Sequence, residues 1–235
     1  METKNINVCE TFPDGTPIDG WFYDTNVPSL DKLGKQYVLT SYGILDDGKL
    51  YTKEIQALID LAAKEGGGVI VVPSGHSPNK DERNMTSFEH RFNMCQIAVR
   101  NLKSITVSDI EHMCNSTSYT YATLLKFKEM YPLDELYFIM GADSLDYFER
   151  WYHPEIIAQT AAILVISRED MDIDVISAKI KEINTIFPAD IRIVHCNKID
   201  VSSTMIRSNI KKHQDITGLL PGKVIDYIRL NELYR

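Results

Sequence analysis

The sequence predicts an α/β protein with a doubly wound, mostly parallel sheet and an irregular N-terminal arm. Two observations predict the sheet. Short runs rich in β-branched and aromatic residues recur along most of the chain, and segments with apolar residues at helical spacing separate them. The runs lie at 37–40, 69–72, 105–107, 136–140, 161–166 and 190–194. Strands that alternate with helices in this way form parallel sheets covered by helices on both faces.

Composition and charge are those of a globular protein that does not bind nucleic acid. The chain has 235 residues, of which 44% are hydrophobic and 25% are charged, with a formal net charge of −8. This acidic balance opposes nonspecific binding to nucleic acid, so a phosphate site would need local positive groups. The sequence shows neither the apolar region of a signal peptide nor a run long enough to span a bilayer. We therefore expect a cytoplasmic protein without membrane contact, whose four scattered cysteines are free thiols.

The chain has two regions that differ in pattern. Residues 1–34 show neither helical nor strand periodicity, and they contain three prolines and an aromatic patch at Trp21, Phe22 and Tyr23. They form either an arm that packs through this patch or a disordered tail. Residues 35–235 carry the alternating pattern and are predicted to form one domain.

A run of three glycines, 66–68, follows the first predicted helix. The strand at 37–40 leads through a turn into this helix, which Thr52 can cap, and the strand at 69–72 comes next. Glycines that hold phosphate lie between a strand and the following helix, whereas these lie after a helix. We interpret them as a helix stop.

Further helices are predicted beyond the second strand. Residues 86–89, Thr-Ser-Phe-Glu, form a capping box that opens a helix with Cys95 on its apolar side. Four later helices are predicted. One begins after 118–120, the second covers 175–183, the third begins at 202–204, and the last runs from about 221 to 230.

A phosphate-binding helix start is predicted at 200–207. Ser202, Ser203 and Thr204 follow a predicted strand, and Arg207 lies one turn into the next helix. Free N–H groups and the helix dipole favour an anion at such a start, and the hydroxyls and the arginine add contacts. The alternative is an ordinary serine N-cap without a ligand.

A second binding position is predicted after the central strand at 136–140. The strand ends at Gly141, and Asp143 could bind a ribose hydroxyl or a magnesium-bound water, or simply cap a helix. Trp151 and Tyr152 offer flat surfaces for an aromatic base, or belong to the core. Because parallel strands end at one edge of a sheet, both binding positions should face the same crevice.

Short motifs in a fixed order carry a family resemblance. They are Val72-Pro73-Ser74-Gly75, Pro78-Asn79-Lys80, 86–94 with Arg91, 118–124, 138–144, Trp151, 202–207, 219–221 and 227–228. Over about residues 69–235 the chain resembles the bacterial nicotinate-mononucleotide adenylyltransferases. The resemblance implies a Rossmann-like nucleotidyltransferase fold and an enzyme of NAD biosynthesis.

The resemblance also implies a reaction and its binding residues. The phosphate of nicotinate mononucleotide attacks the α-phosphorus of ATP, which brings Mg²⁺, and gives nicotinate adenine dinucleotide and pyrophosphate. Such a transfer requires two anions held in line and neutralisation of the transition-state charge. The implied ATP-binding residues are Gly141, Asp143, Ser202, Ser203, Thr204 and Arg207. The implied contacts of the mononucleotide are Thr120 at the nicotinate carboxylate, Trp151 at the ring, and Lys80 and Arg91 as phosphate contacts. Tyr152, whose flat surface lies beside Trp151 in the sequence, is counted with the substrate-binding residues.

The His-x-Gly-His motif of this family, which opens its first helix, is absent. Residues 40–49 read Thr-Ser-Tyr-Gly-Ile-Leu-Asp-Asp-Gly-Lys, and no histidine precedes His76. Asn79 also stands where the family usually has a histidine. Losing groups that stabilise the transferring phosphorus should lower the rate roughly a thousandfold or more. We therefore expect weak or absent turnover, and the alternative is a catalytically silent nucleotide-binding protein.

Residues 15–75 carry a resemblance of their own. They are similar to the N-terminal start of polygalacturonase-like glycoside hydrolases at 21–23, 42–43, 47–48, 55–60 and 66–75. Both families have a strand that ends in Val-Pro-x-Gly, which places a sequence junction near 74–78. The junction has two alternative origins, a natural gene fusion or a product of sequence assembly. The β-helix and catalytic aspartates of the hydrolases do not follow, so a carbohydrate-related module is a remote alternative.

Overall fold

The computed structural model describes 35–40 as backbone, and 67–75, 86–102, 104–112, 118–168, 172–196 and 201–235. The chain divides into two units, Met1–Lys32 and Leu33–Arg235, and every element below belongs to the second. The predicted arm, the helix after Thr52, the turn at 41–49 and Lys80 lie outside the described residues. Their predictions therefore stay predictions.

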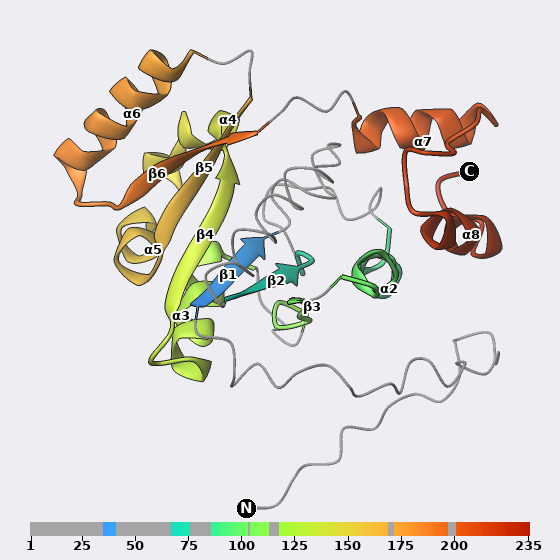
Figure 1. Cartoon of the computed structure of the whole chain (residues 1–235), viewed down its shortest axis with the longest axis horizontal. Helices are drawn as coiled ribbons and strands as arrows, with labels where there is room; N and C mark the ends of the chain where they lie inside the picture. The colour runs from blue at the N-terminus through green and yellow to red at the C-terminus, as the bar shows by residue number, and fades with distance from the viewer. Residues whose placement is uncertain are drawn as a thin grey trace, which may run out of the picture. The chain divides into compact units, whose positions relative to one another are not determined.

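The described part of the second unit contains a six-stranded sheet in the order β3-β2-β1-β4-β5-β6 (Figure 1). Every neighbouring pair of strands is parallel. The strands are β1 (Lys35–Thr40), β2 (Gly68–Val72), β3 (Ile105–Val107), β4 (Glu135–Gly141), β5 (Ala162–Arg168) and β6 (Ile191–Cys196). The predicted doubly wound α/β fold is confirmed, and each predicted strand is present.

The strand order reverses between β1 and β4, at the centre of the sheet. Tyr37 of β1 pairs with Val69 of β2 on one side and with Tyr137 of β4 on the other. The chain therefore runs outward from β1 to β3 and then returns to the centre to build β4, β5 and β6. Ligands of such folds bind at this reversal, beyond the carboxyl ends of the strands.

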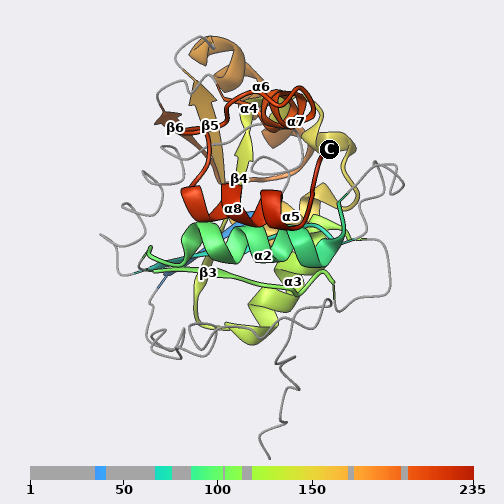
Figure 2. The same cartoon turned by 90° about the vertical axis from the view of Figure 1, so that its right-hand side faces the viewer.

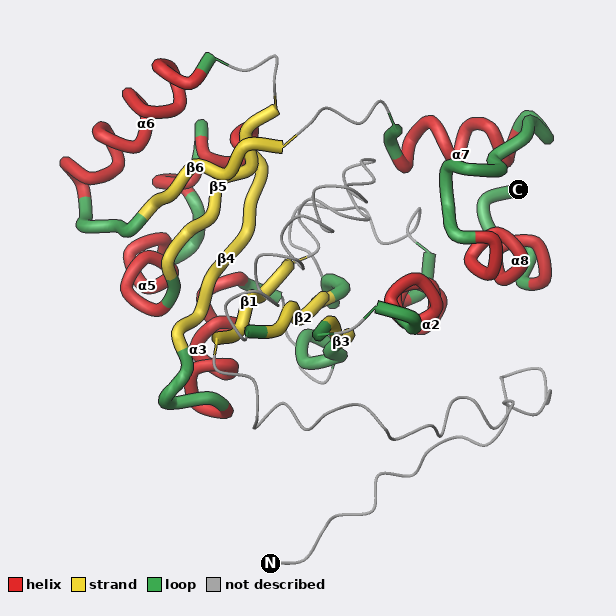
Figure 3. The backbone as a smooth tube through the Cα atoms, viewed as in Figure 1, coloured by secondary structure: helices red, strands yellow, loops and turns green. Residues whose placement is uncertain are grey.

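From β2 onward, helices lie between successive strands, and α7 and α8 follow the last strand, β6 (Figure 3). They are α2 (Phe88–Val99), α3 (Thr120–Met130), α4 (Ala142–Leu145), the 3-10 helix η4 (Phe148–Arg150), α5 (Pro154–Thr160), α6 (Ile173–Ile186), α7 (Ser203–Lys211) and α8 (Gly222–Leu230). The helix α8 packs against α2, as two perpendicular views show (Figure 1; Figure 2). Among the described residues, none of the helices has the length and apolar character needed to cross a membrane.

Both faces of the sheet are buried under helices. Phe138 of β4 belongs to an apolar cluster with Phe127 of α3 and Ile157 of α5. Ile139, the next residue, belongs to the opposite cluster with Cys95 of α2. Successive side chains of a strand point to opposite faces, so a strand covered on both sides reads as one continuous apolar run. Cys95 is buried and is not part of a disulfide, as expected.

The start of α2 corrects one local prediction. The N-cap is Ser87, whose Oγ accepts a hydrogen bond from the N–H of His90 at 3.4 Å. A capping box over 86–89 is therefore wrong by one residue, because the third helical position is His90 and not Glu89. Glu89 still lies in the first turn, where the helix dipole favours a carboxylate.

Candidate functional site

The end of β4 leads directly into the short helix α4 at the carboxyl edge of the sheet. Gly141 is the N-cap, with an extended backbone (φ −75°, ψ 152°) and no side-chain cap. Asp143 lies in the first turn of α4 and is exposed. The interpretation of Asp143 as a helix N-cap is therefore wrong. Asp143 follows the end of β4, one of the two strands at the reversal, and its predicted ribose or magnesium-water contact stays a prediction.

The start of α7 combines a capped helix with an arginine. Ser202 is the N-cap, and its Oγ accepts a hydrogen bond from the N–H of Met205 at 3.1 Å. Ser203 is buried, and its Oγ accepts a hydrogen bond from Nη1 of Arg207 at 3.3 Å. Thr204 is exposed. Ser202 is thus confirmed as the N-cap of α7. The guanidinium lies against the first turn, where an anion would also meet free N–H groups, and the binding of an anion there stays a prediction.

A small apolar cluster fixes α7 to α8. Ile206 of α7 and Ile225 of α8 are buried together with Ile216 from the connection between the two helices. Leu219 and Leu220 pack against them. The helix start at Ser202 is therefore held by α8. That this start shares a crevice with the end of β4 stays a prediction.

The start of α3 and the segment after η4 come together through aromatic rings. Thr120, the first residue of α3, is buried. Its neighbour Tyr119 has its ring 4.7 Å from that of Tyr152, centroid to centroid, and Tyr121 has its ring 5.6 Å from it. Tyr152 remains 56% exposed. The structure thus brings together the Thr120 and Tyr152 segments, which are about thirty residues apart.

Trp151 belongs partly to the core. Its ring meets those of Phe138 and Phe148 edge to face, with centroid distances of 6.1 Å and 5.6 Å. It is only partly buried, and the exposed ring of Tyr147 lies 6.4 Å from it. Core packing, the alternative left open by the sequence, therefore applies to part of this side chain. A stacking role for its remaining surface stays a prediction.

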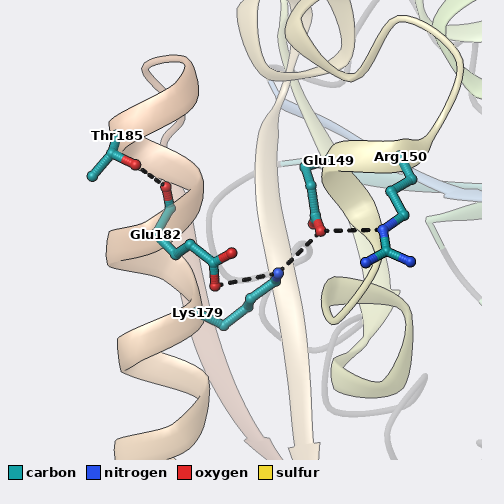
Figure 4. A network of polar contacts seen from close by, with 5 residues as sticks. All are labelled: Glu149, Arg150, Lys179, Glu182 and Thr185. Carbon is teal, nitrogen blue, oxygen red and sulfur yellow. Dashed lines mark hydrogen bonds and ion pairs between the residues drawn. The ribbon is translucent and has the colours of Figure 1, made fainter.

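A polar network fixes η4, which Trp151 directly follows, against α6 (Figure 4). Nζ of Lys179 lies 3.2 Å from Oε1 of Glu149 and 3.4 Å from Oε2 of Glu182. Nε of Arg150 lies 3.7 Å from the same Glu149 oxygen. Burial would raise the pKa of Glu149, but the backbone hydrogen bond and the Lys179 ammonium outweigh it, and the pKa lies below its usual value.

Arg91 is buried and hydrogen-bonded to backbone. Nη1 donates to the carbonyl of Ser74 at 2.7 Å, and Nε donates to the carbonyl of Thr86 at 3.1 Å. The guanidinium also lies 5.5 Å from the ring centre of Phe88. In this arrangement it joins the residues on either side of 76–85. Its predicted phosphate contact stays a prediction.

Sequence reasoning missed Glu111, a buried carboxylate behind the start of α3. It accepts hydrogen bonds from Gly75 and Thr123, which are far from it in sequence. The one available signal was an acidic residue shortly after the strand at 105–107. Within the described ranges, no group of three or more His, Cys, Asp or Glu gathers to hold a metal ion.

Comparison with known proteins gives concordant matches. The profile of the cytidylyltransferase-like family matches residues 56–209. A probable nicotinate-nucleotide adenylyltransferase of Carboxydothermus hydrogenoformans is 35% identical over 167 residues, which is 71% of this chain and 83% of that protein. A probable nicotinate-nucleotide adenylyltransferase of Lachnoclostridium phytofermentans is 36% identical over 166 residues, with the same coverage of 71% and 83%.

Solved structures show the same fold. Plasmodium falciparum nicotinic acid mononucleotide adenylyltransferase complexed with NaAD aligns with a TM-score of 0.64 at 24% identity, over 85% of this chain and 97% of that chain. The same enzyme complexed with APC gives a TM-score of 0.62 at 24% identity, with the same coverage of 85% and 97%.

Proposed function

Because this chain belongs to the cytidylyltransferase-like family and, by its curated relatives, to the nicotinate-nucleotide adenylyltransferases, we propose that it binds ATP and nicotinate mononucleotide and joins them. The phosphate oxygen of the mononucleotide forms a bond to the α-phosphorus of ATP, and the bond from that phosphorus to the β-phosphate bridge breaks. The products are nicotinate adenine dinucleotide and pyrophosphate. Magnesium enters with the triphosphate as part of the substrate, and the reaction takes place in the cytoplasm.

The start of α7 is the observation that supports the proposal most. The first N–H groups of a helix have no partner within it and attract an anion, and Arg207 lies against this turn through its bond to Ser203. The triphosphate would bind here, with Ser202 and Thr204 as further contacts. Arginine suits this role because its planar, permanently charged fork donates several hydrogen bonds to phosphate oxygens.

The remaining site residues divide between the two substrates. Gly141 and Asp143, at the end of β4, would contact the adenosine side of ATP or a magnesium-bound water. Thr120, at the start of α3, would meet the nicotinate carboxylate. The segment of Trp151 and Tyr152 would contact the nicotinate ring, since its aromatic surface lies next to the start of α3.

Phosphate contacts complete the proposed site. Lys80 and Arg91 are assigned to them by resemblance. The Arg91 guanidinium donates two of its five N–H groups to the carbonyls of Ser74 and Thr86 and would offer the others to a phosphate.

Turnover is the part of the proposal that departs from the family. No His-x-Gly-His occurs anywhere in the sequence, and Asp46 and Asp47 lie in the corresponding stretch. Carboxylates repel a triphosphate, and the missing donors no longer offset charge at the transferring phosphorus. We therefore propose substrate binding with a rate about a thousandfold or more below that of relatives that carry the motif. A catalytically silent nucleotide-binding protein is the second candidate, favoured by the same absence.

Two measurements on the purified chain test this proposal. Calorimetric titration with nicotinate mononucleotide and with Mg–ATP should show binding of each. A coupled assay of pyrophosphate release, run beside a relative that carries the motif, should show a rate at or near the detection limit. Absence of binding by both nucleotides overturns the proposal, and turnover equal to the relative's overturns the argument about the missing histidines. Binding of pectin fragments instead would favour the carbohydrate module.

A further inference from the structure

Glu111 is a buried carboxylate that joins two segments of the candidate site. It is 7% exposed and lies in the turn after β3. Its Oε2 accepts a hydrogen bond from the backbone N–H of Gly75 at 3.1 Å, and its Oε1 accepts one from the hydroxyl of Thr123 at 2.8 Å. Gly75 lies just beyond β2, and Thr123 lies in the first turn of α3. One side chain therefore ties the end of β2 to the start of α3.

The packing around these bonds is tight. A Cβ atom on Gly75 would stand 2.5 Å from the backbone oxygen of Glu111 and 2.7 Å from Oγ of Ser118. Real Cβ atoms do not approach backbone oxygen that closely. Only glycine therefore lets the chain beyond β2 come close enough to Glu111 for its N–H to reach the carboxylate.

The same turn is held from its other side. The carbonyl of Ser74 accepts a hydrogen bond from the buried guanidinium of Arg91 on α2, at 2.7 Å. The peptide unit between Ser74 and Gly75 is thus bonded at both ends to buried side chains, its carbonyl to Arg91 on α2 and its N–H to Glu111. Hydrogen bonds to charged groups in a poorly hydrated place are stronger than ordinary ones, so this turn has a defined position.

The environment of the carboxylate fits a structural position, because the residue is buried and its oxygens are hydrogen-bonded. Burial raises the pKa of Glu111, although the bonds from Thr123 and Gly75, the nearby Ser118 hydroxyl and the charge of Arg91 act in the opposite direction. An isolated buried carboxylate costs several kcal/mol, and proteins keep such groups where each oxygen has a partner. Both oxygens of Glu111 have one.

We propose that Glu111 is a positioning residue for the nicotinate-mononucleotide part of the site. Through Gly75 and Thr123 it fixes the first turn of α3, so that Thr120 and the backbone around it stay aligned with the nicotinate carboxylate. This inference rests on the proposed function. It adds a residue that touches no substrate but affects the binding of nicotinate mononucleotide. The binding of ATP should not depend on it, because its hydrogen bonds reach α3 and the end of β2 and not α7.

The effect of each substitution follows from hydrogen-bond chemistry. Glu111→Ala leaves the Gly75 N–H buried without a partner and releases Thr123, so the affinity for nicotinate mononucleotide should fall about tenfold or more. Glu111→Gln keeps both links. Its amide oxygen accepts from Gly75, its amide nitrogen donates to the Thr123 hydroxyl, and that hydroxyl can donate to the carbonyl of Tyr119, which lies 3.3 Å away. The affinity of the Glu111→Gln variant for nicotinate mononucleotide should stay within about threefold of that of the original chain.

The test is calorimetry on the full chain and its variants, titrated separately with nicotinate mononucleotide and with Mg–ATP. Thr123→Val, which keeps the side-chain shape and removes the hydroxyl, is a second variant that preserves the fold if Glu111→Ala does not. It should weaken the mononucleotide several-fold and leave ATP unchanged. Glu129→Ala, an exposed change on the same helix, is the matched control and should alter neither affinity.

The outcomes separate this inference from the proposed function. Loss of mononucleotide binding in Glu111→Ala, with ATP binding kept and with recovery in Glu111→Gln, supports a positioning role. Unchanged mononucleotide affinity in Glu111→Ala and Thr123→Val overturns it, as does an equal loss of both nucleotides, which would mean general destabilisation. If the original chain binds neither nucleotide, the proposed function falls and this inference falls with it. If the original chain binds both nucleotides and these substitutions change neither affinity, only this inference is overturned.

Discussion

The phenolic oxygen of Tyr227 on α8 lies 2.9 Å from Nδ1 of His90 on α2. The same oxygen accepts a hydrogen bond from Nδ2 of Asn93 at 3.0 Å. Tyr227 is buried, and burial is the main cause that raises the pKa of its hydroxyl. Since α8 carries the apolar contacts of α7, this hydroxyl connects α7, whose start is proposed to bind phosphate, to the helix that contains Arg91.

Tyr227→Phe should lower the stability of the protein. The change removes the hydroxyl, so the partly buried side chains of His90 and Asn93 each lose a hydrogen-bond partner. The free energy of unfolding should fall by about 1–2 kcal/mol. Urea unfolding measures this difference. Tyr147→Phe, at a tyrosine that is 44% exposed, is the control and should change the free energy by less than about 0.5 kcal/mol. Equal stability of both variants would contradict a role for this hydroxyl in holding α8.

Arg207→Ala should weaken the binding of Mg–ATP. The guanidinium lies against the first turn of α7, and losing a charge-assisted contact to phosphate costs about 1.5–3 kcal/mol, or roughly tenfold or more in affinity. Titration at two salt concentrations measures it, and the variant should depend less on salt. Lys211→Ala, in the last turn of the same helix, is the matched control. A larger loss in the control would place the phosphates elsewhere.

Lys179→Met should remove a pH-dependent part of the stability. The pKa of Glu149 lies below its usual value of 4.5, so its ion pair stabilises the fold above about that pH and loses this effect as the pH falls through the lowered pKa. With side chains 14% and 16% exposed, the pair should contribute about 1–2 kcal/mol. Unfolding curves between pH 3 and 7, roughly spanning this window, should converge for the two proteins at the acid end. Parallel curves would refute the assignment.

Restoring the missing motif should raise turnover. We expect that replacing 41–49 with the glycine-rich turn and His-x-Gly-His of a relative will increase the rate of pyrophosphate release by roughly a hundredfold or more. The affinity for Mg–ATP should rise, because Asp46 and Asp47, which repel the triphosphate, are removed while the α7 contacts remain. A second graft with both histidines changed to alanine controls for the new backbone. No gain over that control would show that the low rate has another cause.

The sheet was predictable because each strand carries its own signal. β4 is apolar at every buried position, since helices cover both faces, and its run ends at Gly141 where the strand ends. The helix start at Ser202 was predictable for the same reason, as its cap depends on residues three positions apart. Short-range chemistry of this kind can be seen in one sequence without an alignment.

Contacts between distant segments were not predictable. Glu111 bonds to Gly75, which lies 36 positions away, and Tyr227 bonds to His90, which lies 137 positions away. Nothing in the local pattern of either residue indicates its partner. The error in the predicted cap of α2 has a smaller cause. Thr86 and Ser87 are both good N-cap residues, and the structure shows that Ser87 is the cap, with His90 at the third helical position.

Gly75 has a consequence for how such a chain can be recombined. The two resemblances of the sequence meet at 74–78, and both bring a glycine to this position. A side chain there would collide with the backbone oxygen of Glu111. A crossover that loses the glycine would therefore give a chimaera in which the chain after β2 cannot pack against Glu111. A crossover that keeps it has to supply β1 and β2, which pair through their backbones with each other and with β4 and β3. Shuffled libraries of this fold should therefore place their seam at this residue.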